Sequence, residues 1–389
     1  MARDYTHPPG QGRSGPATGP VEARWYSAAS LVKRLAPTLL LSSCALAAGC
    51  GGVRGPAPPA VFPMSPLWAT PVSDFVEGTL ATDGRRLFAL TRDGVVHALD
   101  PETGQVLWRS EQRSGTLAAG AAGLFVRLVD GTVKRLAGAR GTVRWEAASG
   151  IVGDLPPVLD GDRVLVAGRG MAALDAATGR VLWAAPTDPA VTALPVVVGA
   201  RLFAGEEDGT LRCRDRATGL SLWTLRTGST LLAPALPDPE RRRLYLGTTD
   251  RRILEVELEK GRPGWAWKVG ADVEAPGLIH GDRVLFACFD AVLYAVDRGN
   301  GHLVWRAPLP SRPLSGPLLS GTTVLVACHE NDLVGFDVKT GRPVGALRTP
   351  ARIGTAPLLL DGRVFLGLRD RTVVGLALAG PEAEPAPAP

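Results

Sequence analysis

The sequence predicts an all-β fold, an eight-bladed β-propeller made of four-stranded antiparallel blades. Three observations support this prediction. A glycine followed four residues later by a tryptophan recurs along the chain at a regular spacing. The 47 glycines and 33 prolines interrupt the apolar runs before they reach helical length. One further tryptophan, Trp68, lies 40 residues before Trp108, the tryptophan of the first full repeat, while the last repeat lacks its final strand.

Each repeat contains a turn that reverses the chain into a tryptophan-bearing strand. In the clearest copy, Asp100 begins the turn, Gly104 ends it and Trp108 follows in the next strand. The Asp side chain accepts backbone N–H bonds in such a turn, and Gly supplies a positive φ. Successive tryptophans from Trp108 onward lie 37, 38, 40, 42 and 40 residues apart, and a seventh copy has Gly345 in place of the tryptophan. The repeat positions are the tryptophans Trp68, Trp108, Trp145, Trp183, Trp223, Trp265 and Trp305, the glycines Gly104, Gly179, Gly219, Gly301 and Gly341, and the aspartates Asp100, Asp175, Asp215, Asp297 and Asp337.

The residues between two tryptophans predict four strands per unit. A short first strand contains a proline or small residues, for example Pro157, and a turn such as Asp160-Gly161 leads into a second strand with the β-branched run at 164–166. A third strand ends in the turn aspartate, and the fourth strand carries the tryptophan. Small residues suit the first strand, because we expect it to lie crowded near the propeller axis.

The two ends of the repeat array complement each other. The last unit, residues 353–378, has three strands and then continues into a proline-rich tail. Trp68 marks an orphan fourth strand, so residues 66–72 are expected to pair with the strand near residues 373–378. Seven complete units and this shared blade make eight, and sealing the ring in this way removes its free sheet edges.

The N-terminal part predicts export and lipid anchoring. Lys33 and Arg34 precede an apolar run at 35–49 that is too short to span a membrane comfortably. The run ends in Leu-Ala-Ala-Gly before Cys50, which resembles the cleavage and lipidation motif of bacterial lipoproteins. Cys44 is a second, less favoured candidate. No Asp follows Cys50, which fits retention at the outer membrane, and we expect the protein to face the periplasm there.

Five segments follow from these patterns. Residues 1–30 are interpreted as a disordered extension or a misplaced gene start, because a signal peptide rarely begins so far upstream. Residues 31–49 form the signal peptide, and residues 50–64 form a flexible Gly/Pro tether. The propeller occupies residues 65–380, and residues 381–389 form a disordered proline-rich tail.

The repeat resembles the quinoprotein-like, or PQQ-like, propeller repeat, in which the tryptophan packs between neighbouring blades. Lipidated cysteine, short tether and a single propeller together resemble the BamB family of the outer-membrane β-barrel assembly machinery. This resemblance implies a non-enzymatic scaffold, expected to be monomeric, with protein partners in the barrel assembly complex. Its only expected contact with the membrane is the lipid anchor. The alternative is another binding or sensor propeller with a different partner or ligand.

A quinone-dependent dehydrogenase is the least favoured interpretation, and no cofactor or catalytic residue is expected. Quinoprotein dehydrogenases use a pair of adjacent cysteines, whereas Cys213, Cys288 and Cys328 are scattered. Cys288 and Cys328 occupy equivalent places in successive units, so a disulfide between them stays open at this point. The histidines share no metal-ligand spacing, and no metal site is expected.

The charge pattern argues against nucleic-acid binding and indicates one candidate face. The formal net charge is +5, of which residues 1–49 account for +3, so the remainder is nearly neutral. Turns between second and third strands should lie at the same end of the ring as the linkers between blades. These segments form a mixed charged face, where we expect a partner to bind. Its members are Glu206, Glu207, Asp208, Asp290, Glu330, Asn331, Asp332, Arg226, Lys268, Arg312 and Arg352.

Overall fold

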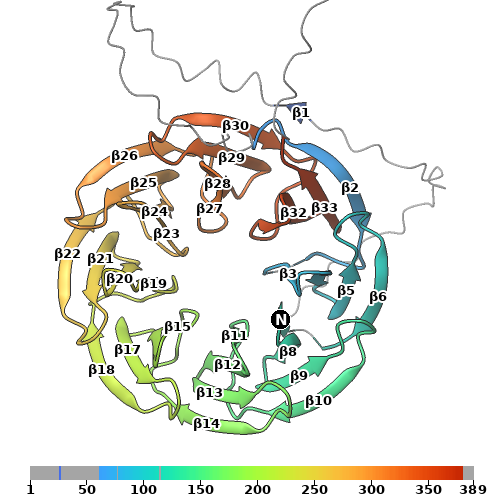
Figure 1. Cartoon of the computed structure of the whole chain (residues 1–389), viewed down its shortest axis with the longest axis horizontal. Helices are drawn as coiled ribbons and strands as arrows, with labels where there is room; N and C mark the ends of the chain where they lie inside the picture. The colour runs from blue at the N-terminus through green and yellow to red at the C-terminus, as the bar shows by residue number, and fades with distance from the viewer. Residues whose placement is uncertain (1–25, 28–60, 77, 114, 380–389) are drawn as a thin grey trace, which may run out of the picture.

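The computed structural model describes residues 26–27, 61–76, 78–113 and 115–379 and is all-β over these ranges (Figure 1). Eight four-stranded antiparallel sheets stand around one axis, which confirms the predicted eight-bladed propeller. Within each blade the first strand lies nearest the axis and the fourth strand lies on the outer circumference (Figure 1). No helix in the described residues is long and apolar enough to cross a membrane.

The strands of blades 1 to 4 follow in chain order. Blade 1 consists of β3 (Ala81–Thr82), β4 (Leu87–Leu90), β5 (Val95–Leu99) and β6 (Val106–Glu111). Blade 2 consists of β7 (Gly115–Gly120), β8 (Gly123–Leu128), β9 (Thr132–Leu136) and β10 (Val143–Ala148). Blade 3 consists of β11 (Val158–Asp160), β12 (Arg163–Gly168), β13 (Gly170–Asp175) and β14 (Val181–Pro186). Blade 4 consists of β15 (Val196–Val198), β16 (Arg201–Gly205), β17 (Thr210–Asp215) and β18 (Ser221–Arg226).

Blades 5 to 8 complete the ring. Blade 5 consists of β19 (Leu236–Asp238), β20 (Arg243–Gly247), β21 (Arg252–Glu257) and β22 (Pro263–Lys268). Blade 6 consists of β23 (Leu278–His280), β24 (Arg283–Cys288), β25 (Val292–Asp297) and β26 (Leu303–Pro308). Blade 7 consists of β27 (Leu318–Ser320), β28 (Thr323–Ala327), β29 (Asp332–Asp337) and β30 (Pro343–Arg348). Blade 8 combines β31 (Leu358–Leu360), β32 (Arg363–Leu368) and β33 (Thr372–Ala377) with β2 (Ser65–Pro71).

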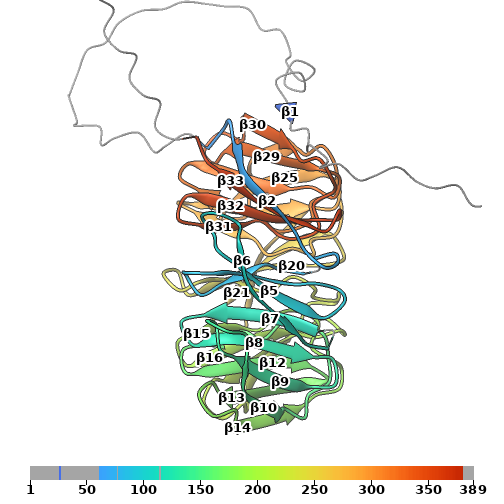
Figure 2. The ribbon, with the colours of Figure 1, turned by 90° about the vertical axis from the view of Figure 1, so that its right-hand side faces the viewer.

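The N-terminal strand closes the ring. β2 pairs antiparallel with β33, and Trp68 lies opposite Gly375 in the register. Figure 2 shows the two strands side by side at the top of the ring. The prediction that residues 66–72 pair with the end of the last unit is therefore confirmed. The short β1 (Tyr26–Ser27) adds a fifth strand to blade 7 along the outer edge of β30.

The repeat tryptophans lie between neighbouring blades. A Cβ atom on Gly104 would collide with the ring of Trp68, so only glycine, here at φ +71°, leaves room for the indole of the preceding blade. The indole N–H of Trp68 donates to the carbonyl of Pro101, 3.2 Å away. The same close approach recurs in seven pairs: Trp68/Gly104, Trp108/Gly141, Trp145/Gly179, Trp183/Gly219, Trp223/Gly261, Trp265/Gly301 and Trp305/Gly341.

Blade 7 fills the space of its missing tryptophan with a residue from outside the repeat. The ring of Phe62 lies against Gly345 and Gly335, so closely that a Cβ atom on either glycine would collide with it. Val61 and Met64 are buried in the core shared by blades 7 and 8. Residues 61–64 of the predicted tether therefore pack on the propeller, and residues 50–60 lie outside the described residues.

The core is divided into clusters, several of which join neighbouring blades. Cys288 lies in a cluster shared by blades 5 and 6, Cys328 lies in the next one, shared by blades 6 and 7, and both thiols are buried and free. The disulfide that the sequence left open is therefore absent. Gly205, at the place equivalent to Cys288 in blade 4, faces Leu231 so closely that a Cβ would lie 2.6 Å from that side chain. Small residues at this place let the next linker pack against the blade.

Candidate partner-binding face

One end of the ring carries both the turns between second and third strands and the linkers between blades; we call it the linker face. In seven blades, all but blade 2, a backbone hydrogen bond ties the turn between the second and third strands to the linker that enters the blade. For example, the amide of His329 donates to the carbonyl of Arg312 over 2.8 Å. The amides of Arg92, Arg169, Glu207, Thr249, Phe289 and Arg369 make equivalent bonds to the carbonyls of Phe75, Val152, Ala190, Thr230, Asp272 and Arg352. The linker face is therefore a continuous, hydrogen-bonded surface.

The structure divides the acidic residues predicted on this face. Glu207 and Asp208 are exposed. Glu206 is 1% exposed and accepts two hydrogen bonds from Arg212, of 2.5 and 2.8 Å. Asp332 is also buried, and burial raises the pKa of its carboxyl group. The expectation that Glu206 and Asp332 contribute to an exposed charged surface is therefore wrong. Each of the two lies in a short run of acidic and polar residues. Successive side chains of a strand point to opposite faces, so one residue of such a run points into the blade.

The basic residues of the face remain accessible. Arg226 and Lys268 are exposed at the ends of β18 and β22. The guanidinium carbon of Arg312 lies 5.9 Å from the ring centroid of Phe289, a cation–π contact. Arg352 lies 3.7 Å from Glu330, and both side chains are more than half exposed. A partner can bind these cations at a small cost in free energy, because the exposed ion pairs that it would break are weak.

Asp290 and Asn331 have structural partners. Tyr294 donates its hydroxyl to Asp290 over 2.6 Å, while the other carboxylate oxygen of Asp290 is buried without a partner. Burial, followed by this bond to Asp290, raises the pKa of Tyr294 to about 12. Asn331 donates to the carbonyl of Thr349 over 2.9 Å. Both residues therefore shape their turns, and the exposed charges beside them are the groups available to a partner.

Sequence reasoning missed a polar cluster beside the closing strand. Ser73 follows β2, and its hydroxyl lies 2.9 Å from Nε2 of the buried His97 and 3.1 Å from Asp93. Asp93 does not contact the imidazole Nδ1, which is buried without a partner. Burial, aided by the charge of Arg109, lowers the pKa of His97 to about 4. This imidazole is a weak base at neutral pH and lacks the carboxylate that orients a catalytic histidine. The contact joins blade 1 to the closing strand.

A buried arginine was also missed. Arg127, at 1% exposure, donates to the carbonyls of Leu155 and Ala167 over 2.7 and 2.5 Å and to that of Ile151 over 3.0 Å. Burial lowers its pKa to about 10, and the charge of Asp154 opposes this effect. Arg127 therefore ties the linker between blades 2 and 3, through the carbonyls of Ile151 and Leu155, to β12 of blade 3, through that of Ala167. No periodic signal marks it, because its partners lie far along the chain.

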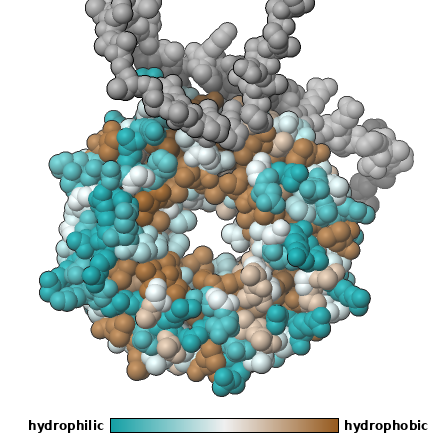
Figure 3. All heavy atoms as spheres, viewed as in Figure 1, coloured by the Kyte–Doolittle hydropathy of each residue, from teal (hydrophilic) through white to brown (hydrophobic). Residues whose placement is uncertain are grey.

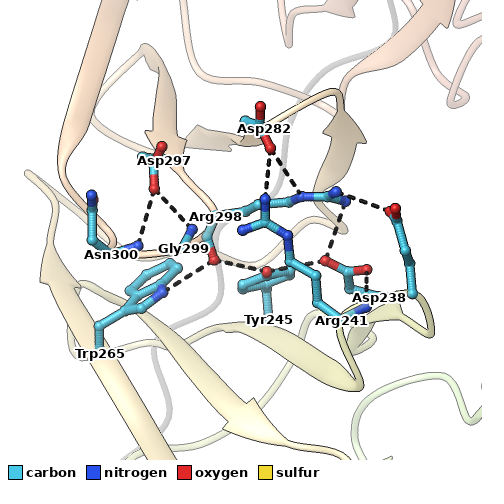
Figure 4. A network of polar contacts seen from close by, with 10 residues as sticks. Asp238, Arg241, Tyr245, Trp265, Asp282, Asp297, Arg298, Gly299 and Asn300 are labelled. Atoms are coloured by element: carbon cyan, nitrogen blue, oxygen red, sulfur yellow. Dashed lines mark hydrogen bonds and ion pairs between the residues drawn. The ribbon is translucent and has the colours of Figure 1, made fainter.

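The opposite end of the ring, which we call the turn face, holds a charged network between blades 5 and 6 (Figure 4). Arg298 of blade 6 lies 3.3 Å from Asp238 and 2.9 Å from Glu240, both in blade 5. Arg241 of blade 5 reaches back to Asp282 over 2.6 Å. Reciprocal pairs of this kind hold the first turn of blade 5 against its neighbour.

An aromatic residue extends this network into the core. Tyr245 donates to the carbonyl of Arg298 over 3.0 Å, and Trp265 donates to the same carbonyl over 3.4 Å (Figure 4). A second arginine at the equivalent place, Arg216, lies 2.6 Å from Asp160 of the preceding blade. The turn face therefore uses its charges for contacts between blades, whereas the linker face leaves several of its charges exposed.

The described residues do not gather three or more metal-ligating side chains at one place. Figure 3 shows an open channel along the axis, with apolar and more polar residues both bordering the visible mouth. Cys50, the predicted lipidation site, lies outside the described residues. What the geometry provides is a rigid ring with a charged and partly unpaired face, suited to binding a macromolecule.

Comparisons with known proteins agree with this architecture. Residues 65–128, 129–287 and 289–380 match the family model described as outer membrane protein assembly factor BamB. A protein of that name from Vibrio cholerae is 25% identical over 288 residues, which are 67% of each chain. Another from Shewanella oneidensis is 26% identical over 149 residues, 35% of this chain and 38% of that protein.

Solved structures share the fold. BamB from Moraxella catarrhalis has a TM-score of 0.68 at 16% identity, covering 81% of this chain and all of that chain. Quinohemoprotein alcohol dehydrogenase from Comamonas testosteroni has a TM-score of 0.67 at 14% identity, covering 82% of this chain and 77% of that chain. At such identities the likeness concerns the fold alone. The family model spans all eight blades, and the chain therefore belongs to the BamB family of PQQ-like repeat propellers.

Proposed function

We propose that the protein is a non-enzymatic scaffold for assembly of outer-membrane proteins, anchored through Cys50 to the outer membrane and facing the periplasm. The observation that carries this proposal is the match of the whole propeller to the BamB family model. The relatives are named for assembly of outer-membrane proteins. A single closed ring offers a protein partner a broad, rigid surface, and rigid surfaces lose little conformational entropy on binding.

The linker face is the proposed site for the partner. Its exposed charges include Glu207, Asp208, Arg226 and Lys268, which lie in neighbouring blades 4 and 5. Charges of both signs favour a partner with complementary charges and set its orientation. The turn face is less suited, because Arg298, among others, is engaged between blades.

A capture experiment from solubilised outer membranes tests the proposal. The tagged protein should retain components of the barrel assembly machinery, identified by mass spectrometry. Glu207→Lys with Asp208→Lys should reduce their recovery about tenfold or more, since like charges across an interface cost several kcal/mol. The matched control is Asp162→Lys with Asp361→Lys, which makes the same charge change at exposed positions of the turn face. Recovery of no assembly component, or equal losses in both variants, would contradict the proposal.

The fold shared with a quinohemoprotein dehydrogenase makes the non-enzymatic part directly testable. Purified protein mixed with pyrroloquinoline quinone and calcium should oxidise neither alcohols nor sugars in a dye-reduction assay. Stoichiometric quinone binding with dye reduction would overturn this part of the proposal and leave the anchoring untouched.

A further inference from the structure

The outward-pointing acidic residues of the outer strands all lie on one side of the ring. Each outer strand has six residues that align with Leu303–Pro308 of β26. The second, fourth and sixth of these six point away from the ring, and most of them are exposed. In blades 1 and 2 these positions hold Leu107, Arg109, Glu111, Arg144, Glu146 and Ala148, and Glu111 and Glu146 are the acidic residues among all of them. From blade 3 round to blade 8 the positions hold Leu182, Ala184, Pro186, Leu222, Thr224, Arg226, Gly264, Ala266, Lys268, Val304, Arg306, Pro308, Val344, Ala346, Arg348, Leu67, Ala69 and Pro71.

Apolar and basic side chains stand next to one another at blades 6 to 8. Val304 is 44% exposed, Val344 is 47% exposed and Leu67 is 45% exposed. Arg306 and Arg348 are exposed on the same outer strands as the two valines. We call these five residues the blade 6–8 rim. Long basic side chains beside apolar ones are suited to a surface with anionic headgroups above an apolar interior.

The charge of the surrounding sector has the same sign. Residues 303–378, which contain β26, blade 7 and the three C-terminal strands of blade 8, carry nine basic and five acidic side chains, a net charge of +4. Residues 61–302 carry 28 basic and 29 acidic side chains, a net charge of −1. The ring is therefore electrostatically polarised, with its positive side at blades 7 and 8.

The N-terminal segment joins the ring on this same side. Val61 is buried between blades 7 and 8, and Phe62 packs on β30. In Figure 1, β2 begins beside β30 on the outer circumference. The eleven residues from Cys50 to Ala60 can span at most about 40 Å. A lipid on Cys50 would thus hold blades 7 and 8 close to the membrane at high effective concentration.

We propose that the blade 6–8 rim is a membrane-contact surface that adsorbs to anionic phospholipid headgroups. The surface adds a second contact to the lipid anchor, and together they orient the ring with blades 2 and 3 turned away from the membrane. Each basic residue near an anionic surface adds only a weak attraction, so the two arginines bind weakly alone and effectively when tethered. The orientation of the ring relative to the membrane rests on the anchoring at Cys50 in the proposed function. The test of the surface needs neither the lipid anchor nor a protein partner.

Vesicle binding by the chain that begins at Gly51 tests the surface itself. This chain contains residues 61–379, which close the ring, and lacks Cys50 and β1. It should cosediment at low salt with vesicles of phosphatidylglycerol and phosphatidylcholine and not with phosphatidylcholine alone. Arg306→Glu with Arg348→Glu should weaken binding about tenfold or more. The matched control, Arg140→Glu with Arg144→Glu, changes the same charge at exposed positions of blade 2 and should bind like the parent chain.

A fluorescence measurement reports which side meets the vesicle. An environment-sensitive dye on Val344→Cys should shift to shorter wavelength on binding, while the same dye on Glu146→Cys should not; Cys213, Cys288 and Cys328 are buried and stay unlabelled. Absence of vesicle binding, equal loss in both arginine variants, equal binding to neutral vesicles or equal dye shifts would each overturn the inference. The vesicle and dye experiments use no protein partner, and the capture experiment uses no vesicles. Failure of the membrane-contact inference can therefore be distinguished from failure of the scaffold proposal.

Discussion

Blades 2 to 6 and blades 7, 8 and 1 are held together by different means. Each boundary in the first group is filled by a tryptophan and a glycine from the repeat itself. In the second group the short segment 61–73 contributes three contacts: Phe62 in blade 7, Trp68 in blade 8 and Ser73 on His97 of blade 1. We call this group the seam. The comparison teaches that a closed repeat array needs special residues where its ends meet, because the local pattern ends there.

The largest effect is expected from the closing tryptophan. Trp68→Ala should lower the free energy of unfolding by about 3–5 kcal/mol, the usual range for truncating a large packed aromatic side chain. Trp183→Ala, the equivalent change away from the seam, should cost a similar amount. Urea titrations of both variants measure this. A much smaller loss for Trp68→Ala would show that the seam adds little and would break the comparison.

Acid should weaken the seam through His97. The pKa of this imidazole is lowered to about 4 in the folded protein from 6.5, so the unfolded chain binds the proton more tightly. Its contribution is therefore complete above pH 6.5 and falls by about 3 kcal/mol as the pH drops to 4. Unfolding free energies of the parent and His97→Gln proteins across this range isolate the effect. Parallel pH profiles would contradict it.

Phe62→Ala should cost about 2 kcal/mol, less than a fully buried phenylalanine, because this side chain is only partly buried. Gly345→Trp should also destabilise, since the new indole would collide with Phe62. The double variant should recover part of the loss, because a tryptophan would then occupy its usual place in the repeat. A double-mutant cycle measures this coupling. Additive losses would show that Phe62 does not replace the missing tryptophan.

The smallest effect is expected in the turns, where the two regions should behave alike. Asp100 in the seam and Asp297 in blade 6 each accept two backbone N–H bonds, of 2.8 to 3.0 Å. Replacement of either by Ala should cost about 1 kcal/mol, the net value of such bonds. Thermal unfolding of the two variants measures these losses. A loss of stability in only one variant would show that the contribution of the turn depends on whether it lies in the seam.

Much of the fold could be predicted because its causes are local and repeated. The spacing from Trp68 to Trp108 sufficed to place the closing strand, since it equals one repeat. Strand order sufficed to place the candidate face. Glu206 and Asp332 were wrongly assigned to its surface, because a run of acidic residues in the sequence does not show which side chain points into the blade. Ser73, His97 and Arg127 carried no signal, because their partners are distant in the sequence.

By itself the sequence determined the blade count, the strand order, the turns and the point of closure, since each depends on residues within one period of about 40 positions. The tertiary structure alone decided that Phe62 completes blade 7, that Arg298 joins blades 5 and 6, and that Val344 and Arg348 share one side with the incoming N-terminal segment. These features depend on which surfaces meet when the ring closes. Closure brings together residues as far apart as Phe62 and Gly345, and no local pattern encodes that distance.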